Sequence, residues 1–291
     1  MSSSQGSPSR TSSTVAEGRG ATGGPSLIAA GGSTSLGWRE VDFGIAGKVA
    51  LVTAATKGIG LGIAQALARE GAHVSVVART RADVDLVARQ LDGVGVAADL
   101  LTEDGCRQAV EETTSRLGPV DILINNLGVR AGMSWKDTGT RELELAFQGN
   151  AVVSARMSQL VLGPMVERGW GRVVMITSVW GREAGGFPAY NAAKAAEISL
   201  AKSLAREYGR TGVTVNAVAP GSVLWEGGGW DRRQKADPEG IADFIRHEMP
   251  MGRFGTVEEV ADVVAFLCSR QASLVTGACI AVDGGQGRSN I

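Results

Sequence analysis

The chain has 291 residues, 44% of them hydrophobic, and carries a formal net charge of −1 at pH 7. That length and apolar content suffice for one large α/β domain with a substantial core. A charge this close to zero gives no electrostatic basis for binding nucleic acid or an anionic membrane surface. No apolar run approaches the roughly 18 residues of a transmembrane helix. We therefore expect no nucleic-acid partner and no membrane partner.

The cysteines and histidines do not form a metal-binding or disulfide pattern. Cys106, Cys268 and Cys279 are an odd, scattered set without C-x-x-C, and His73 and His247 lie far apart. Neither a disulfide framework nor a zinc site is indicated. These features favour a reducing compartment, the cytoplasm, and no structural metal.

The first 40 residues differ in amino-acid composition from the rest of the chain. They are rich in Ser, Gly and Thr and show neither helical nor strand periodicity, so residues 1–40 are predicted to be a disordered tail. The apolar patch at 27–30 is too short for the core of a secretory signal. Residues 41–291 are expected to form the folded domain.

A strand, a glycine-containing turn and a helix open that domain. Val49 to Thr53 read as a short buried strand, Ala54 to Gly60 as the turn, and helical spacing begins at Leu61. Such a turn directs backbone N–H groups at a helix N-terminus toward a phosphate. By itself the turn is equally consistent with simple packing.

The second strand, His73 to Val77, is followed by basic residues where a dinucleotide-binding domain meets the adenosine ribose. Arg79 can hold a 2′-phosphate through two hydrogen bonds, and Lys57 in the first turn agrees. NADP(H) is therefore favoured over NAD(H). The alternative is that Arg79 lies in solvent at the end of the strand.

Strands and helices continue to alternate, which predicts a doubly wound parallel sheet with helices on both faces and ligands beyond the carboxyl ends of the strands. The remaining expected helices are near 83–91, 102–117, 140–166, up to 208, and 257–269, and the remaining expected strands are 94–98, 120–124, 172–177, 213–218 and 278–282.

The segment from Ser178 to Lys194 offers acid–base chemistry. Tyr190 and Lys194 are four residues apart and share a helix face. An ammonium group beside a phenol stabilises the phenolate, so the pair can exchange a proton with a substrate. An isolated Tyr-x-x-x-Lys would more often be an exposed tyrosine with a solvated lysine.

Between Gly47 and Gly285 the chain resembles the short-chain dehydrogenase/reductase family, in its single-domain branch. The motifs that carry the resemblance are T-x-x-x-x-G-I-G at 53–60, Asp99, N-N-x-G at 125–128, Asn150, Ser178, Tyr190-x-x-x-Lys194, Pro220-Gly221 and V-D-G-G at 282–285. Each motif is weak alone, whereas their order and spacing together are specific. The resemblance implies a Rossmann fold.

The resemblance also implies roles for four residues. Tyr190 would be the general acid that protonates a carbonyl oxygen, and the base in the reverse direction. Lys194 would stabilise the tyrosinate and bind the nicotinamide ribose. Ser178 would hydrogen-bond the substrate oxygen, and Asn150 would hold a water that links Lys194 to solvent.

The cofactor contacts follow from the same resemblance. The residues expected to bind the dinucleotide are Thr53, Lys57, Gly58, Ile59, Gly60, Arg79, Asp99, Leu100, Asn126, Gly128, Tyr190, Lys194, Pro220, Gly221 and Val223. Three positions depart from the family pattern. Ala54 replaces the first turn glycine, which requires a negative φ there, Leu127 replaces an alanine, and Trp225 stands where a threonine is common.

Residues 222–255 occupy the position of the substrate lid and are expected to be mobile. Trp180, Phe187 and Trp225 are the expected substrate-pocket residues, with Trp230 on the same lid, and they favour a fairly hydrophobic carbonyl substrate. The basic cluster Arg232, Arg233 and Lys235 could attract an acyl-carrier protein or a phosphorylated substrate, although a solvated face is the more common explanation.

The function expected from this resemblance is an NADP(H)-dependent ketoreductase, similar to the 3-oxoacyl-carrier-protein reductases. Its substrate would be a small carbonyl compound or alcohol, with an acyl thioester as an open alternative. An NAD-linked sugar or polyol dehydrogenase is disfavoured by Arg79, and enoyl reduction by the Tyr–Lys spacing. A catalytically idle NADP(H)-binding sensor or scaffold is the rival of another class. The resemblance further implies a homotetramer.

Overall fold

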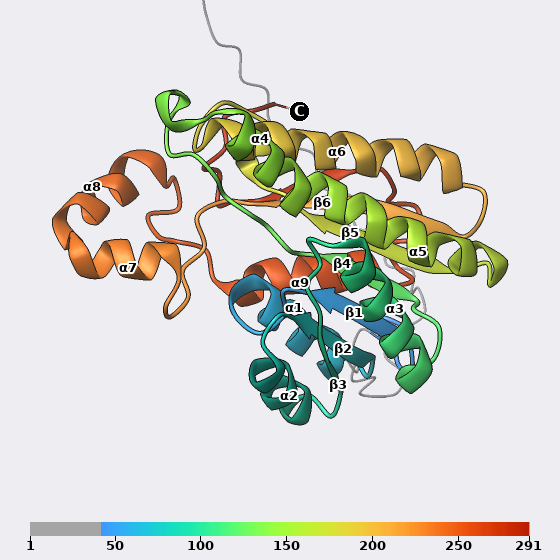
Figure 1. Cartoon of the computed structure of the whole chain (residues 1–291). Coiled ribbons are helices and arrows are strands. Elements are labelled where there is room, and N and C mark those ends of the chain that lie inside the picture. The colour runs from blue at the N-terminus through green and yellow to red at the C-terminus, as the bar shows by residue number, and fades with distance from the viewer. Residues whose placement is uncertain (1–41, 291) are drawn as a thin grey trace, which may run out of the picture. The chain divides into compact units, whose positions relative to one another are not determined.

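The computed structural model describes residues 42–290, which form one parallel sheet of seven strands in the order β3-β2-β1-β4-β5-β6-β7 (Figure 1). The predicted disordered tail, 1–40, lies outside these residues. The strands are β1 (Val49–Thr53), β2 (His73–Ala78), β3 (Val94–Ala97), β4 (Ile122–Asn125), β5 (Gly171–Ile176), β6 (Val213–Pro220) and β7 (Cys279–Val282).

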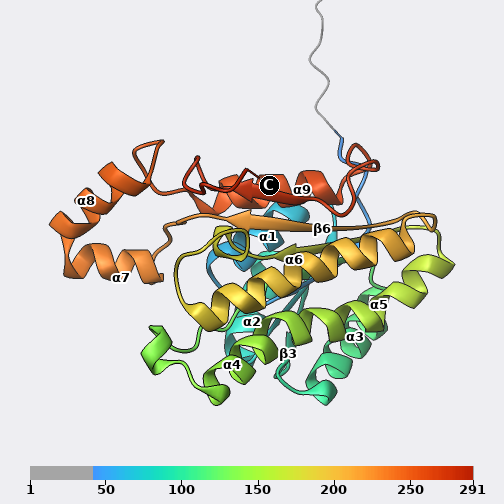
Figure 2. The same cartoon turned by 90° about the horizontal axis from the view of Figure 1, so that it is seen from above.

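Successive side chains along a strand point alternately into two hydrophobic cores, one on each face of the sheet. In β1, Ala50 and Val52 point into one cluster and Leu51 into the other, as the period of two in a strand requires. The helices that supply the first cluster are α1 (Gly58–Arg69), α2 (Arg81–Gln90) and α9 (Val257–Cys268), and those that supply the second are α3 (Glu103–Leu117), α5 (Val153–Glu167) and α6 (Pro188–Tyr208). Figure 2 shows α1 and α9 on one side of β6, with α5 and α6 on the other. The predicted doubly wound sheet is confirmed.

The strand order reverses beside β1, because β2 pairs with it on one side and β4 on the other. The connections after β1 and β4 therefore leave the sheet in opposite directions at its carboxyl edge. Such a switch point is where ligands bind in doubly wound folds. The glycine turn 54–60 and the N-N-L-G segment 125–128 both begin at this point.

The long helix expected over 140–166 is interrupted. The structure has α4 (Thr140–Phe147), a π-helical turn (Gln148–Val152) and then α5. A π turn inserts an extra residue into the helical ladder and changes the direction of a side chain, often at a functional site. Asn150 lies in this turn and is fully buried.

The segment 222–255 holds two helices that the sequence reading did not predict, α7 (Gly229–Ala236) and α8 (Pro238–Glu248). They project beyond the sheet in Figures 1 and 2. Trp230 stacks on Phe244 with ring centroids 4.7 Å apart and contacts Phe254 at 5.0 Å. It therefore belongs to the small apolar core of this α7–α8 lobe.

Short 3-10 turns at Trp135–Asp137 and Val179–Gly181 complete the elements. Within 42–290, no helix has the length and apolarity needed to cross a membrane.

Candidate active site

Four side chains expected at the reaction centre are buried at the carboxyl end of β5. Ser178 follows that strand, Tyr190 and Lys194 come from the first turns of α6, and Asn150 comes from the π turn. The Lys194 Nζ lies 5.6 Å from the centre of the Tyr190 ring. Gly181 is in close contact with the Lys194 backbone, since a Cβ at Gly181 would lie 2.8 Å from it. The turn after Ser178 thus packs directly on α6.

Lys194 is almost wholly buried, and each contact of its ammonium is with a defined group. Its Nζ donates to the carbonyl of Ile176 at 2.8 Å, which ties α6 to the end of β5. It also forms an ion pair with Glu197 Oε2 at 2.6 Å, and the Ser154 hydroxyl lies 2.6 Å from the other carboxylate oxygen. Burial raises the pKa of Glu197, and the Lys194 cation opposes that rise.

Sequence reasoning missed Glu197. Its signal was present, because a glutamate three residues after Lys194 falls on the buried face of the predicted helix. Ionised carboxylates are almost never fully buried without a partner. A charged residue on the apolar face next to Lys194 therefore indicated an ion pair.

Asn150 lies near Lys194, next to Gly128. Its Nδ2 donates to the carbonyls of Val129 at 2.8 Å and Ala146 at 2.6 Å, while its buried Oδ1 has no hydrogen-bond partner among the described residues. A Cβ placed on Gly128 would lie 3.4 Å from that oxygen and 3.7 Å from Lys194 Nζ. Gly128 therefore leaves a polar gap between the asparagine and the lysine.

The turn after β1 fits a dinucleotide phosphate. A Cβ on Gly60 would lie 2.5 Å from the Ala54 carbonyl oxygen, so only glycine permits this tight turn. The N-cap residue of α1, Lys57, makes no side-chain cap hydrogen bond, and the first turn carries no acidic residue. The N–H groups at this helix end are thus available to an anion. Ile59, which is half-buried, lies within the same turn.

Thr53 and Asn126 join the turn to the end of β4. The backbone N–H of Asn126 donates to Thr53 Oγ1 at 2.8 Å, and the Asn126 side chain donates to the carbonyls of Thr53 and Ala54 at 3.0 and 3.2 Å. Asn126 was expected among the residues that bind the dinucleotide. In this structure its amide holds the turn in place.

The requirement of a negative φ at Ala54 is wrong, because Ala54 has a φ of 51°. This left-handed conformation costs an L-residue about 1–2 kcal/mol. A glycine avoids that steric cost, but part of the gain is offset because glycine loses more backbone entropy on folding. We expect Ala54→Gly to raise the free energy of unfolding by about 1 kcal/mol, measured by urea denaturation. Ala55→Gly, at the neighbouring buried position, should instead lower it.

The adenosine end of the site carries an exposed cation. Arg79 follows β2 directly and has no hydrogen bond or ion pair within residues 42–290. Asp99 accepts a hydrogen bond from the Leu101 N–H at 3.1 Å, and its neighbour Leu100 is buried. The end of β2 therefore presents one unneutralised guanidinium where a ribose phosphate is expected.

The residues expected on the nicotinamide side of the site lie at the end of β6. Gly221 donates its N–H to the Val282 carbonyl at 3.0 Å, so the turn after Pro220 is fixed to β7. Val223 is buried and pairs with Gly255 in an isolated bridge. This bridge joins the two ends of the segment that carries α7 and α8.

The three expected pocket aromatics lie in different places. Trp180 packs on the backbone of Gly185 and Gly186 in its own loop, and Phe187 is the residue before α6. Trp225 covers Gly58, whose Cβ would lie 2.8 Å from the indole. Trp225 therefore contacts the turn expected to bind phosphate.

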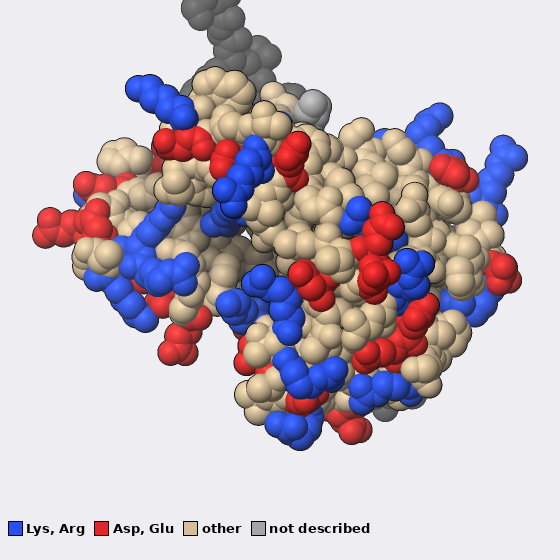
Figure 3. Space-filling view, viewed as in Figure 1, with Lys and Arg blue, Asp and Glu red and all other residues tan. Residues whose placement is uncertain are grey.

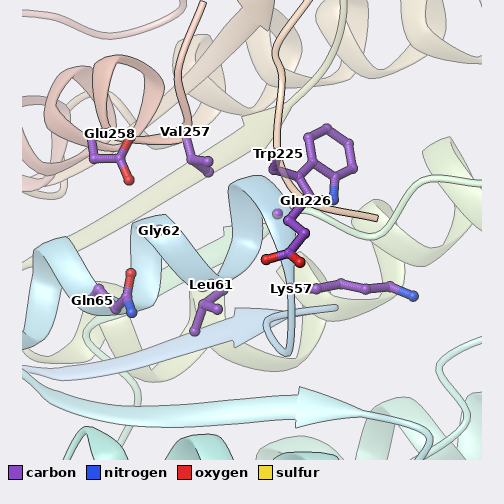
Figure 4. A pocket seen from close by; sticks show the side chains of 9 residues that line it. Lys57, Leu61, Gly62, Gln65, Trp225, Glu226, Val257 and Glu258 are labelled. Atoms are coloured by element: carbon purple, nitrogen blue, oxygen red, sulfur yellow. The ribbon is translucent and has the colours of Figure 1, made fainter. Parts of the chain in front are cut away.

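A cavity of ≈ 240 Å³ opens between α1, α9 and Trp225 (Figure 4). Lys57 and Gly58 line it from the phosphate turn, and Glu226 and Glu258 contribute carboxylates. The cavity borders the cofactor turn and has none of the four buried residues of the reaction centre in its lining.

Comparisons with known proteins agree with this geometry. A family model described as enoyl-(acyl carrier protein) reductase matches residues 53–286. The 3-oxoacyl-[acyl-carrier-protein] reductase of Aquifex aeolicus is 37% identical over 82% of this chain and 97% of its own length, and the L-xylulose reductase of Mesocricetus auratus is 36% identical over 84% and 98%. The crystal structure of L-sorbose reductase from Gluconobacter frateurii, complexed with NADPH and L-sorbose, is 30% identical with a TM-score of 0.80, covering 86% of this chain and 100% of that one.

Proposed function

Because this chain belongs to the short-chain dehydrogenase/reductase family of oxidoreductases, we propose that it transfers a hydride between NADP(H) and a ketone or secondary alcohol. The observation that supports this most directly is the meeting of Tyr190, Lys194 and Asn150 at the carboxyl end of β5, beside Ser178. Similar proteins named as reductases of a 3-oxoacyl thioester, L-xylulose and L-sorbose agree with a carbonyl substrate.

In the proposed reaction, bound NADPH supplies the hydride. The phenol of Tyr190 donates the proton that the carbonyl oxygen takes up, and takes it back in the oxidative direction. The Ser178 hydroxyl donates a hydrogen bond to the same oxygen and stabilises the charge that develops there. Lys194 provides the positive charge that favours the phenolate after the proton has left.

Asn150 has a separate role in this proposal. Its unpartnered Oδ1 lies near Lys194 across the gap at Gly128, where a water bound to both would return protons to the lysine. The π turn supports this role, because it places the amide between the carbonyls of Val129 and Ala146, so that its donors are used and its oxygen remains.

The first experiment is NADPH oxidation, followed by absorbance, against ketones, β-ketoesters and acyl thioesters, with NADH run in parallel. Turnover with NADPH well above NADH supports the proposal. Absence of turnover together with detectable NADPH binding would instead favour the idle sensor. An NAD-linked sugar or polyol dehydrogenase would show the reverse cofactor preference with polyols.

Arg79 gives a prediction about cofactor choice. Its exposed guanidinium has no partner among residues 42–290 and can bind the 2′-phosphate through charge-assisted hydrogen bonds worth about 1.5–3 kcal/mol. Arg79→Ala is expected to raise KM for NADPH by about 10–100-fold and to leave KM for NADH within threefold. Arg89→Ala, an exposed arginine on α2, serves as control. An equal change for both cofactors would remove Arg79 from this role.

Enoyl reduction is the second candidate, since the matching family model carries that description. The spacing of Tyr190 and Lys194, four residues apart on one helix, favours carbonyl reduction over it by resemblance. Assays with an enoyl thioester and the corresponding 3-oxoacyl thioester separate the two activities.

Assembly and location remain proposals. A homotetramer formed through the α4–α5 and α6 helices and the β7 edge agrees with the exposed Leu145 on α4, and light scattering of the purified protein tests it. A cytoplasmic location agrees with three free cysteines. A carrier-delivered acyl thioester remains an open substrate class.

A further inference from the structure

Two cations, Lys194 and Arg130, lie near the ring of Tyr190, and they differ in burial and in pairing. Lys194 is buried, and its charge is balanced by Glu197. The Cζ of Arg130 lies 5.4 Å from the centre of the Tyr190 ring and 5.9 Å from that of Phe187. Within residues 42–290, the Arg130 guanidinium has no carboxylate partner and no hydrogen bond, and the residue is exposed.

The backbone next to Arg130 is attached to the π turn through Val129. Val129, the residue before it, accepts the hydrogen bond from Asn150 Nδ2. The Val129 side chain also packs directly on the π turn, since a Cβ on Gly149 would lie 2.3 Å from it. The backbone that carries Arg130 is thus attached to the same element that positions Asn150, and the arginine is held next to the reaction centre.

Arg130 also reaches toward the lobe that faces the site. Its Nη1 would lie 3.9 Å from a Cβ on Gly229, the first residue of α7. Figure 3 shows Lys and Arg side chains along the rim of the hollow between the α7–α8 lobe and the sheet domain. Arg130 therefore lies near both the Tyr190 ring and the first residue of α7.

Two basic residues of α7 are paired within the lobe, since Lys235 forms an ion pair with Asp231 at 2.8 Å and Arg232 donates to the carbonyl of Gly227. Arg233, like Arg130, has a ring contact, but its ring is Trp230, in the apolar core of the lobe, and not Tyr190. Lys194 is paired with Glu197, whereas the N–H groups of the Arg130 guanidinium make no hydrogen bond within residues 42–290.

We propose that Arg130 binds an anionic group of the substrate, so that the preferred substrates are oxo acids or the corresponding hydroxy acids. A guanidinium matches a carboxylate through two parallel hydrogen bonds. Its contact with the Tyr190 ring places that anion within a few bonds of the carbonyl that Tyr190 protonates, as in a 3-oxo or 4-oxo acid. This inference rests on the proposed function and adds the class of substrate.

The test compares acids with their neutral esters. Acetoacetate with ethyl acetoacetate and levulinate with ethyl levulinate are assayed by NADPH oxidation with the native enzyme and with Arg130→Gln, Arg130→Lys and Arg210→Gln. Arg210 is an exposed arginine beyond the end of α6, at the opposite edge of the sheet, and serves as the matched control.

Loss of a charge-assisted pair is expected to lower kcat/KM for the acids by about 10–100-fold in Arg130→Gln. The esters should change less than threefold, Arg130→Lys should be intermediate, and Arg210→Gln should match the native enzyme. Equal preference for acid and ester in the native enzyme, or an equal loss for both in Arg130→Gln, would overturn the proposal. A raised KM for NADPH in Arg130→Gln would assign Arg130 to the cofactor instead.

Calorimetric titration of the NADP⁺-loaded protein with each acid gives a second readout that needs no turnover. If no ketone is reduced but levulinate binds the native protein and not Arg130→Gln, the proposed function fails while the anion site stands. If the esters are reduced but neither acid binds, the proposed anion site is wrong and the proposed reductase function stands.

Discussion

Replacement of Tyr190 by phenylalanine is expected to lower kcat by about 10³-fold while the affinity for NADPH stays within about threefold. Loss of a positioned general acid typically costs 10²–10⁴-fold in rate. The side chain is 7% exposed and its ring packs in the site, so phenylalanine keeps the packing and removes only the hydroxyl. Single-turnover NADPH oxidation measures the chemical step, and fluorescence titration measures binding.

The chain supplies its own control for this experiment. It contains two tyrosines, and Tyr208 lies at the other end of α6. Tyr208→Phe should leave turnover and binding unchanged. If Tyr190→Phe kept more than a tenth of the native rate, the phenol would not be the acid, and the proton donor would have to be sought elsewhere in the site.

The second large effect concerns stability. Glu197→Gln is expected to lower the free energy of unfolding by about 3–5 kcal/mol, because it leaves the buried Lys194 ammonium without its anion. For a domain of this size, that loss corresponds to a fall of roughly 10 °C in Tm. Thermal and urea unfolding of the protein without cofactor measure it directly.

A double variant separates charge from packing. Lys194→Met with Glu197→Leu replaces the buried pair by apolar side chains of similar volume, and such replacements are often neutral in stability. The double variant should therefore be inactive but more stable than Glu197→Gln alone. Glu207→Gln, an exposed glutamate on the same helix, is the control. If the free energy of unfolding of Glu197→Gln were within 1 kcal/mol of the native value, the Glu197 carboxylate would not be balancing the charge of Lys194.

The sequence alone was sufficient for the architecture, because strand and helix periodicities are local. Buried apolar runs such as Val49–Thr53, followed by a turn and a helix of period 3.6, admit a doubly wound sheet with few alternatives. The four residues of the proposed reaction centre and the two glycines of the turn after β1 could also be proposed from the sequence, since most of these motifs directly follow a predicted strand and ligands bind at the carboxyl ends of parallel strands.

Features that depend on contacts between distant segments were decided only by the tertiary structure. Ala54 has a φ of 51° within a tight turn whose carbonyls accept from Asn126, the residue after the neighbouring strand β4. The π turn at Asn150 lies inside a segment that reads as one continuous helix. No local pattern encodes either, since propensities describe a residue's own backbone and not the partner that constrains it.

Charge pairing divides in the same way. The sequence determined which residues could carry the reaction, because a tyrosine and a lysine one helical turn apart share a face wherever the helix lies. The tertiary structure decided which charges remain available. Lys194 and Glu197 are three residues apart on α6, so their pairing is local, although contact with Ser154 on α5 buries the pair. The loop after β4 places Arg130 beside Tyr190 without an ion-pair partner among the described residues. The reaction class thus follows from local spacing, whereas the proposed anion selectivity of the site rests on a contact between distant segments.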